Sequence, residues 1–205
     1  MIEVEHRGLI EKKDFPKLKV FFSKNAEFVE EKDRFSVIYL QTRAERIVET
    51  ANDLIDLKVR ITNKKSELVM KYGKWGGKDS RREFSFPIEN NKFEEMIDFL
   101  KIMGQTHGVL MATKTFVYNY KDIEFVLVEV PNWGYYFEAE ILTDEKTAKE
   151  ADKKLESECK KLGLKLIENE KFYKMLDELN ELPGMKFDFE KQNFSDIKKR
   201  FIDFF

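Results

Sequence analysis

The chain has 205 residues, of which 42% are hydrophobic, and both values suit one globular domain with a substantial core. Charged residues make up 37%, but the formal net charge is only −2, which excludes the strongly basic character typical of nucleic-acid-binding proteins. The single cysteine, Cys159, excludes an intrachain disulfide, and no signal peptide or membrane-spanning segment is evident. We therefore expect a cytoplasmic protein, monomeric or homodimeric, with neither a membrane nor a nucleic acid as its partner.

Eight stretches have the period-two alternation, or the β-branched and aromatic content, that predicts β-strands. In chain order they are residues 1–8, 35–42, 56–62, 66–72, 81–88, 109–120, 123–130 and 135–142. Polar or glycine-containing turns are expected at residues 63–65, 121–122 and 131–134. Helical spacing of apolar residues predicts helices over residues 15–23, 93–103, 144–162 and 169–181, with a further amphipathic helix within 187–205.

Charged residues recur at alternate positions of these strands, so that one face of the sheet is predicted to be charged. The face comprises Glu3, Glu5, Arg7, Lys58, Arg60, Glu67, Lys71, Arg81, Glu83, Lys114, Glu129, Glu138 and Glu140. An antiparallel sheet of this size commonly closes into a barrel, but so many charges cannot form a dry interior. The sequence therefore predicts an α+β fold: an eight-stranded antiparallel closed β-barrel around a wet tunnel, with flanking helices and a helical C-terminal part.

Several of these segments resemble, in order, the motifs of the CYTH or triphosphate tunnel metalloenzyme superfamily. Glu3-Val4-Glu5-His6-Arg7 is similar to its N-terminal Glu-x-Glu-x-Lys, and Leu57-Lys58-Val59-Arg60 to its basic strand. Residues 68–71 and 81–83 resemble the following Lys and Arg-x-Glu strands, and residues 126–141 resemble the acidic strand, glycine turn and closing Glu-x-Glu. Phe116 departs from the pattern, because the family often has Arg two positions after the residue equivalent to Lys114.

The resemblance covers about the first 180 residues, and it implies a tunnel domain over residues 1–186 with a C-terminal helical extension, residues 187–205, packed on it. It also implies metal-dependent hydrolysis of a triphosphate: inorganic triphosphate, a nucleoside triphosphate or thiamine triphosphate. Class IV adenylate cyclase activity, which converts ATP to cyclic AMP and pyrophosphate, stays open, as does a non-catalytic module that binds polyphosphate or a nucleotide.

The same resemblance assigns roles to individual residues. Mg²⁺ or Mn²⁺ is expected on Glu3, Glu5, Glu129, Glu138 and Glu140, since hard cations prefer carboxylate oxygens. The phosphates are expected on Arg7, Lys58, Arg60, Lys71, Arg81 and Lys114. Lys71, and more weakly Tyr39, are the candidate catalytic groups. His6 falls on the apolar side of its strand and His107 in a loop, so neither is expected in the site.

Overall fold

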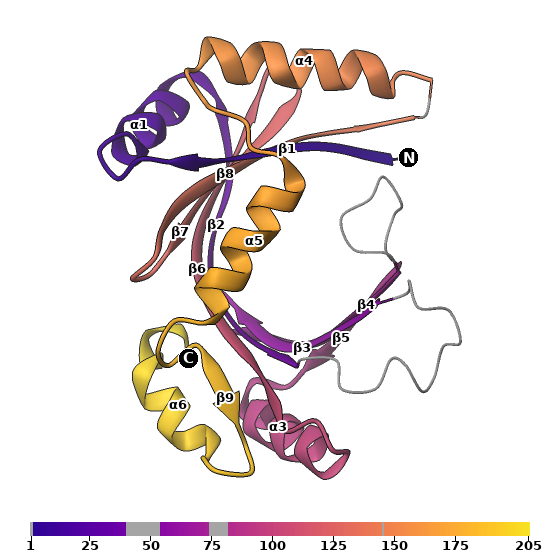
Figure 1. Ribbon diagram of the computed structural model, residues 1–205, viewed down its shortest axis with the longest axis vertical. Helices are drawn as coiled ribbons and strands as arrows, with labels where there is room; N and C mark the ends of the chain where they lie inside the picture. Colours follow the sequence, from indigo (N-terminus) through magenta and orange to yellow (C-terminus); the bar gives the residue numbers. More distant parts are fainter. Residues whose placement is uncertain (1, 40–53, 74–81, 145) are drawn as a thin grey trace. The chain divides into compact units, whose positions relative to one another are not determined.

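The computed structural model describes residues 2–39, 54–73, 82–144 and 146–205 (Figure 1). Its strands are β1 (Ile2–Ile10), β2 (Glu27–Tyr39), β3 (Leu54–Thr62), β4 (Lys65–Gly73), β5 (Arg82–Ile88), β6 (His107–Tyr120), β7 (Ile123–Val130), β8 (Gly134–Thr143) and β9 (Lys186–Asp188). Its helices are α1 (Phe15–Asn25), α3 (Phe93–Ile102), α4 (Ala148–Lys161), α5 (Asn169–Asn180) and α6 (Phe194–Arg200), with two short 3-10 helices, Asn90–Lys92 and Ile202–Phe204. None of the helices described is both long and apolar enough to cross a membrane.

The strands form one nine-stranded antiparallel sheet, which confirms the predicted α+β class. Its hydrogen-bonded order is β1-β8-β7-β6-β2-β3-β4-β5, with β9 paired to β6. Among the described residues the two strands at the ends of this order, β1 and β5, are not paired with each other, so closure into a barrel stays a prediction.

All eight predicted strands are present, although their predicted residues 1, 40–42 and 81 lie outside the described part of the chain. The strand β2 begins at Glu27, eight residues before the predicted start at Phe35. Residues 27–31 are exposed and largely charged, so they carry no apolar face that would indicate a strand. The strand β9 was not predicted, because three residues are too few for a periodic signal.

The described chain falls into two compact units, which are considered separately. The first unit comprises Met1–Lys32 and Thr113–Leu176, and the second comprises Asp33–Ala112 and Asp177–Phe205. The boundary predicted at residue 186 falls inside the second unit.

The core of the first unit lies on the apolar face of β1, β8, β7 and the last part of β6. Phe125 and Phe137 from this face are fully buried with Phe22 of α1 and Leu155 of α4. Figure 1 shows α4 running alongside β1 and β8. Burying a large apolar side chain contributes about 1.5–3 kcal/mol, so these contacts fix which face of the strands is internal.

The core of the second unit lies on the apolar face of β3 and the last part of β2. Val37, Val59 and Ile61 from these strands pack with Ile97 of α3. The segment 187–205 adds a further apolar group, comprising Phe187, Phe189, Phe194 and Ile197. The alternating partners of the strand residues, including Lys58 and Arg60, therefore lie on the opposite face.

Candidate metal and phosphate site

Three glutamates lie opposite one another on adjacent strands of the first unit. Glu5 on β1 pairs with Glu140 on β8, and Glu140 pairs on its other side with Glu124 on β7. Residues paired in this way share a face, with Cβ atoms about 4.5–5.5 Å apart. We call Glu5, Glu140 and Glu124 the carboxylate row. It lies on the face opposite Phe125 and Phe137.

Glu138 and Arg7 extend this acidic face by one further pair. They are opposite each other on β8 and β1, and Arg7 Nε donates to Glu138 Oε1 at 3.0 Å. Arg7 also forms an ion pair with Glu5. The side chains of Glu5, Arg7 and Glu138 are 16%, 18% and 27% exposed. Arg7 therefore holds two of the carboxylates in place and offsets part of their charge.

Like charges directly opposite each other destabilise a sheet. The Glu5–Glu140 and Glu140–Glu124 pairs bring like charges together, and a cation bound among them would lower their mutual repulsion. Carboxylate oxygens gathered on one face are the donors that Mg²⁺ and Mn²⁺ prefer. The chemistry of Glu5, Glu124, Glu138 and Glu140 thus fits a hard divalent ion.

The structure separates two predicted site residues from this face. Glu129 lies opposite Tyr135 on β8 and opposite Lys114 on β6. It alternates along β7 with the same face as Leu127 and Phe125, which is the apolar face. Lys114 Nζ lies 3.8 Å from Glu31 Oε1. Neither Glu129 nor Lys114 is therefore brought together with the carboxylate row. Glu3 pairs through its backbone with Leu142, and its side chain is outside the described part of the chain.

Phe116 lies on the same apolar face as Glu129 and is 4% exposed. Its ring packs edge-on against Phe15, and Lys19 Nζ lies 3.3 Å from the ring centroid. Phe116 is thus a core residue of the first unit, and a charged side chain there would be buried among aromatic rings.

The predicted basic residues of the second unit share one face of β3 and β4, and two of them are already paired with acids. Lys58 Nζ lies 2.8 Å from Asp56 Oδ2, and Arg60 Nε donates to Glu67 Oε1 at 2.6 Å. Lys71 is opposite Asp56 in the β3–β4 register. This basic face, which comprises Lys58, Arg60 and Lys71, is therefore preorganised by neighbouring carboxylates.

Burial and pairing act in opposite directions on these groups. Burial lowers the pKa of Lys58 below its ordinary value, although Asp56 counteracts the shift. Burial alone would raise the pKa of Glu67, but hydrogen bonds from Arg60 and Ser85 hold it below its ordinary value. Glu67 therefore stays ionised and keeps the Arg60 guanidinium in a fixed position.

Two further predicted residues lie elsewhere. Tyr39 is opposite Leu57, on the apolar face, where its ring contacts Phe187 and is 3% exposed. Burial, followed by the charge of Asp98, raises the pKa of Tyr39 above its ordinary value. Its hydroxyl has no hydrogen-bond partner within the described residues, and the structure does not bring it together with Lys58 or Arg60. Arg81 is outside the described residues.

Two acidic residues, Asp56 and Glu124, were not included in the predicted charged face. Asp56 lies two residues before Lys58 on the same strand and therefore shares its face with Lys58 and Arg60. The alternation alone would have placed it on the predicted charged face. Glu124 has no such signal, because its place beside Glu140 depends on the register of the β7–β8 hairpin.

No protein-family model matches the chain, and no curated protein matches it either. Solved structures do. A conserved hypothetical protein from Pyrococcus furiosus has a TM-score of 0.60 at 24% identity, covering 80% of this chain and 91% of that one. A putative adenylate cyclase from Vibrio parahaemolyticus has a TM-score of 0.55 at 16% identity, covering 80% and 90%.

A third similar structure is a putative adenylyl cyclase from Hippeastrum that has a dominant triphosphatase activity. Its TM-score is 0.55 at 15% identity, and the match covers 82% of this chain and 90% of that one. These similarities confirm the predicted fold, and they agree with the resemblance at that level alone. At these identities the likeness says nothing of the reaction, which must be argued from the residues.

Proposed function

We propose that this protein is a metal-dependent phosphohydrolase acting on triphosphates: inorganic triphosphate, or a nucleoside or thiamine triphosphate. The observation that supports the proposal best is the carboxylate row with Glu138 beside it. A surface that only bound anions would gain nothing from four carboxylates on one face, whereas a divalent-ion site needs them.

In this proposal Glu5, Glu138, Glu140 and Glu124 hold Mg²⁺ or Mn²⁺. An ion held there would supply Lewis acidity toward a phosphate oxygen and would favour ionisation of a water molecule. Arg7 keeps Glu138 and Glu5 in place through the ion pairs that it makes with both. Glu129 is left out, because it lies on the apolar face.

The substrate phosphates are assigned to Lys58, Arg60 and Lys71, together with Arg81 and Arg7. Guanidinium and ammonium groups form charge-assisted hydrogen bonds with phosphate oxygens. Glu67 holds Arg60 in one orientation, so that less side-chain entropy is lost when phosphate binds. Lys71 is the candidate base or water-orienting group. The assignment of both sets of residues to one reaction rests on the resemblance of their motifs to the superfamily.

The test incubates the purified protein with Mg²⁺ or Mn²⁺ and either inorganic triphosphate or ATP, and resolves the products by chromatography. Orthophosphate release supports the hydrolase, and the faster substrate identifies the preferred class. Cyclic AMP with pyrophosphate would replace the hydrolase with a cyclase. Binding of either triphosphate without any product would replace it with a non-catalytic binding module.

A further inference from the structure

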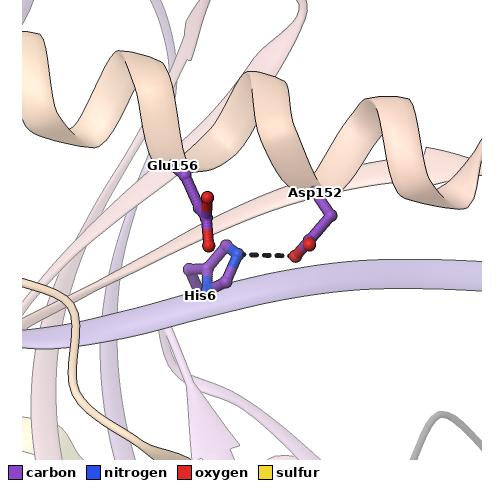
Figure 2. Close-up of side chains that lie close together, drawn as sticks. All are labelled: His6, Asp152 and Glu156. Carbon is purple, nitrogen blue, oxygen red and sulfur yellow. Dashed lines mark hydrogen bonds and ion pairs between the residues drawn. The ribbon is translucent and has the colours of Figure 1, made fainter.

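A histidine and two carboxylates meet on the side of β1 that faces away from the carboxylate row. His6 alternates with Glu5 and Arg7, so it lies on the opposite face of the strand, with Val4 and Ile10. The helix α4 runs alongside this part of the first unit. His6 was not expected in the functional site, but its ring is directed toward two acidic side chains of α4 (Figure 2).

The two acids, Asp152 and Glu156, are one turn apart on α4 and therefore lie on the same side of the helix. His6 Nε2 lies 2.8 Å from Asp152 Oδ1. One ligand atom from each of the three residues lies within 4.8 Å of the other two. Figure 2 shows the carboxylates of both acids turned toward the imidazole from the helix above it.

The hydrogen bond between His6 and Asp152 does not explain why the Glu156 carboxylate also lies close to the imidazole. Like charges four residues apart destabilise a helix, and neither acid forms a salt bridge with Lys or Arg within the described residues. The imidazole is 22% exposed and Asp152 49%, so the three groups are accessible from solvent. Two carboxylates without a Lys or Arg partner among the described residues, together with an imidazole at this spacing, form a ligand set for a cation.

We propose that His6, Asp152 and Glu156 form a second metal site, selective for a borderline transition ion such as Zn²⁺ or Co²⁺. An imidazole nitrogen favours these ions over Mg²⁺, which prefers an all-oxygen shell. Three protein ligands leave a further coordination position for water. Bound at this position, the ion links β1 to α4 and so stabilises the first unit. This site shares no ligand with the carboxylate row, and it does not depend on the proposed hydrolase activity.

The other histidine cluster of the described residues is a weaker candidate. His107 Nε2 lies 3.4 Å from Asp188 Oδ1, but Lys191 already pairs with Asp188 at 2.7 Å. The Thr106 hydroxyl lies between His107 Nδ1 and Glu190, at 2.7 and 3.3 Å. These internal partners satisfy the groups that a metal would need.

The experiment titrates the full-length protein with Co²⁺ in excess Mg²⁺, so that carboxylate-only sites are occupied, and follows binding by calorimetry and by the visible spectrum of bound Co²⁺. We expect one tight equivalent. Its affinity should fall about tenfold or more in each of His6→Gln, Asp152→Asn and Glu156→Gln. Glu150→Gln, which changes an exposed acid of the same helix, should bind as the wild type does, and so should His107→Gln.

Glu156 is exposed, so Glu156→Gln leaves the fold intact even if a substitution at His6 does not. Unchanged Co²⁺ affinity in Glu156→Gln and Asp152→Asn would overturn the proposal. Loss of binding in Glu5→Gln instead would also overturn it, because the ion would then belong to the carboxylate row. Absence of tight Co²⁺ binding to the wild type would leave His6 as a hydrogen-bond partner of Asp152 alone, and it too would refute the site.

Discussion

Arg7 and Glu138 lie opposite each other on β1 and β8, with Arg7 Nε 3.0 Å from Glu138 Oε1. The pair joins two acidic motifs that are far apart in the sequence, one near each end of its strand-rich part. Because Arg7 also contacts Glu5, the position of Glu138 is coupled to that of the carboxylate row.

Glu138→Gln should reduce triphosphate turnover at least about 100-fold while leaving the fold intact. The substitution keeps the shape of the side chain, but it removes the charge that would bind a divalent ion. The initial rate of orthophosphate release under saturating Mn²⁺ measures the effect, and circular dichroism checks the fold.

The matched control for that variant is Glu129→Gln, because Glu129 lies on the apolar face instead of beside the row. We expect it to retain most of the turnover. A loss as large as that of Glu138→Gln would show that Glu129 belongs to the metal site after all.

Arg60→Ala should weaken triphosphate binding by about tenfold or more, since the guanidinium is the positioned donor of the basic face. Arg60→Lys should recover only part of the affinity, because an ammonium cannot make two parallel hydrogen bonds to a phosphate. Calorimetric titration with inorganic triphosphate measures both variants. Unchanged affinity in Arg60→Ala would count against phosphate binding by this face.

Glu67 makes the stability of the second unit dependent on pH. Its folded-state pKa is depressed, so its contribution is present above the unfolded pKa and is lost as the pH falls through the folded value. The free energy of unfolding should therefore fall less steeply below about pH 4.3 in Glu67→Gln than in the wild type. Urea denaturation at a series of pH values compares the slopes, and parallel slopes would rule out this role.

Cys159 should be inert toward thiol reagents in the folded protein. Burial, and then the charge of Glu158, raise the pKa of its thiol to about 12, and the side chain is fully buried in the core of the first unit. Since the thiolate is the reactive species, iodoacetamide labelling at neutral pH should require denaturant. Rapid labelling of the native protein would show that α4 opens readily.

The sequence predicts the strands well, because most of them alternate between one apolar and one polar face. It also groups Glu138 with Glu140 and Lys58 with Arg60, since residues two apart on a strand share a face regardless of what lies beside them. What the sequence does not contain is the register between strands. Glu124 becomes a neighbour of Glu140 only through the hairpin pairing.

Glu129 is a residue that the sequence pattern places on the wrong face, again because the pattern does not contain the register between strands. It is separated from Glu138 by the turn at residues 131–133, where Asn132 adopts a φ of 64°. The length of that turn decides whether Glu129 shares the face of Glu138 or lies opposite it. Similarly, the alternation places Tyr39 with Val37, but only the packing against Phe187 shows that this is the buried face. Loop geometry and tertiary packing set these positions, and neither is encoded in a single periodic pattern.

The most direct test of the account is the divalent-ion dependence of orthophosphate release from inorganic triphosphate, compared between the wild type and Glu140→Gln. Glu140 is the centre of the carboxylate row, with a glutamate opposite it on each side. We predict that the wild type is active only with added Mg²⁺ or Mn²⁺, and that Glu140→Gln is at least about 100-fold slower at every ion concentration. Turnover in the presence of a chelator, or a Glu140→Gln variant as fast as the wild type, would contradict the assignment of the row as the metal site.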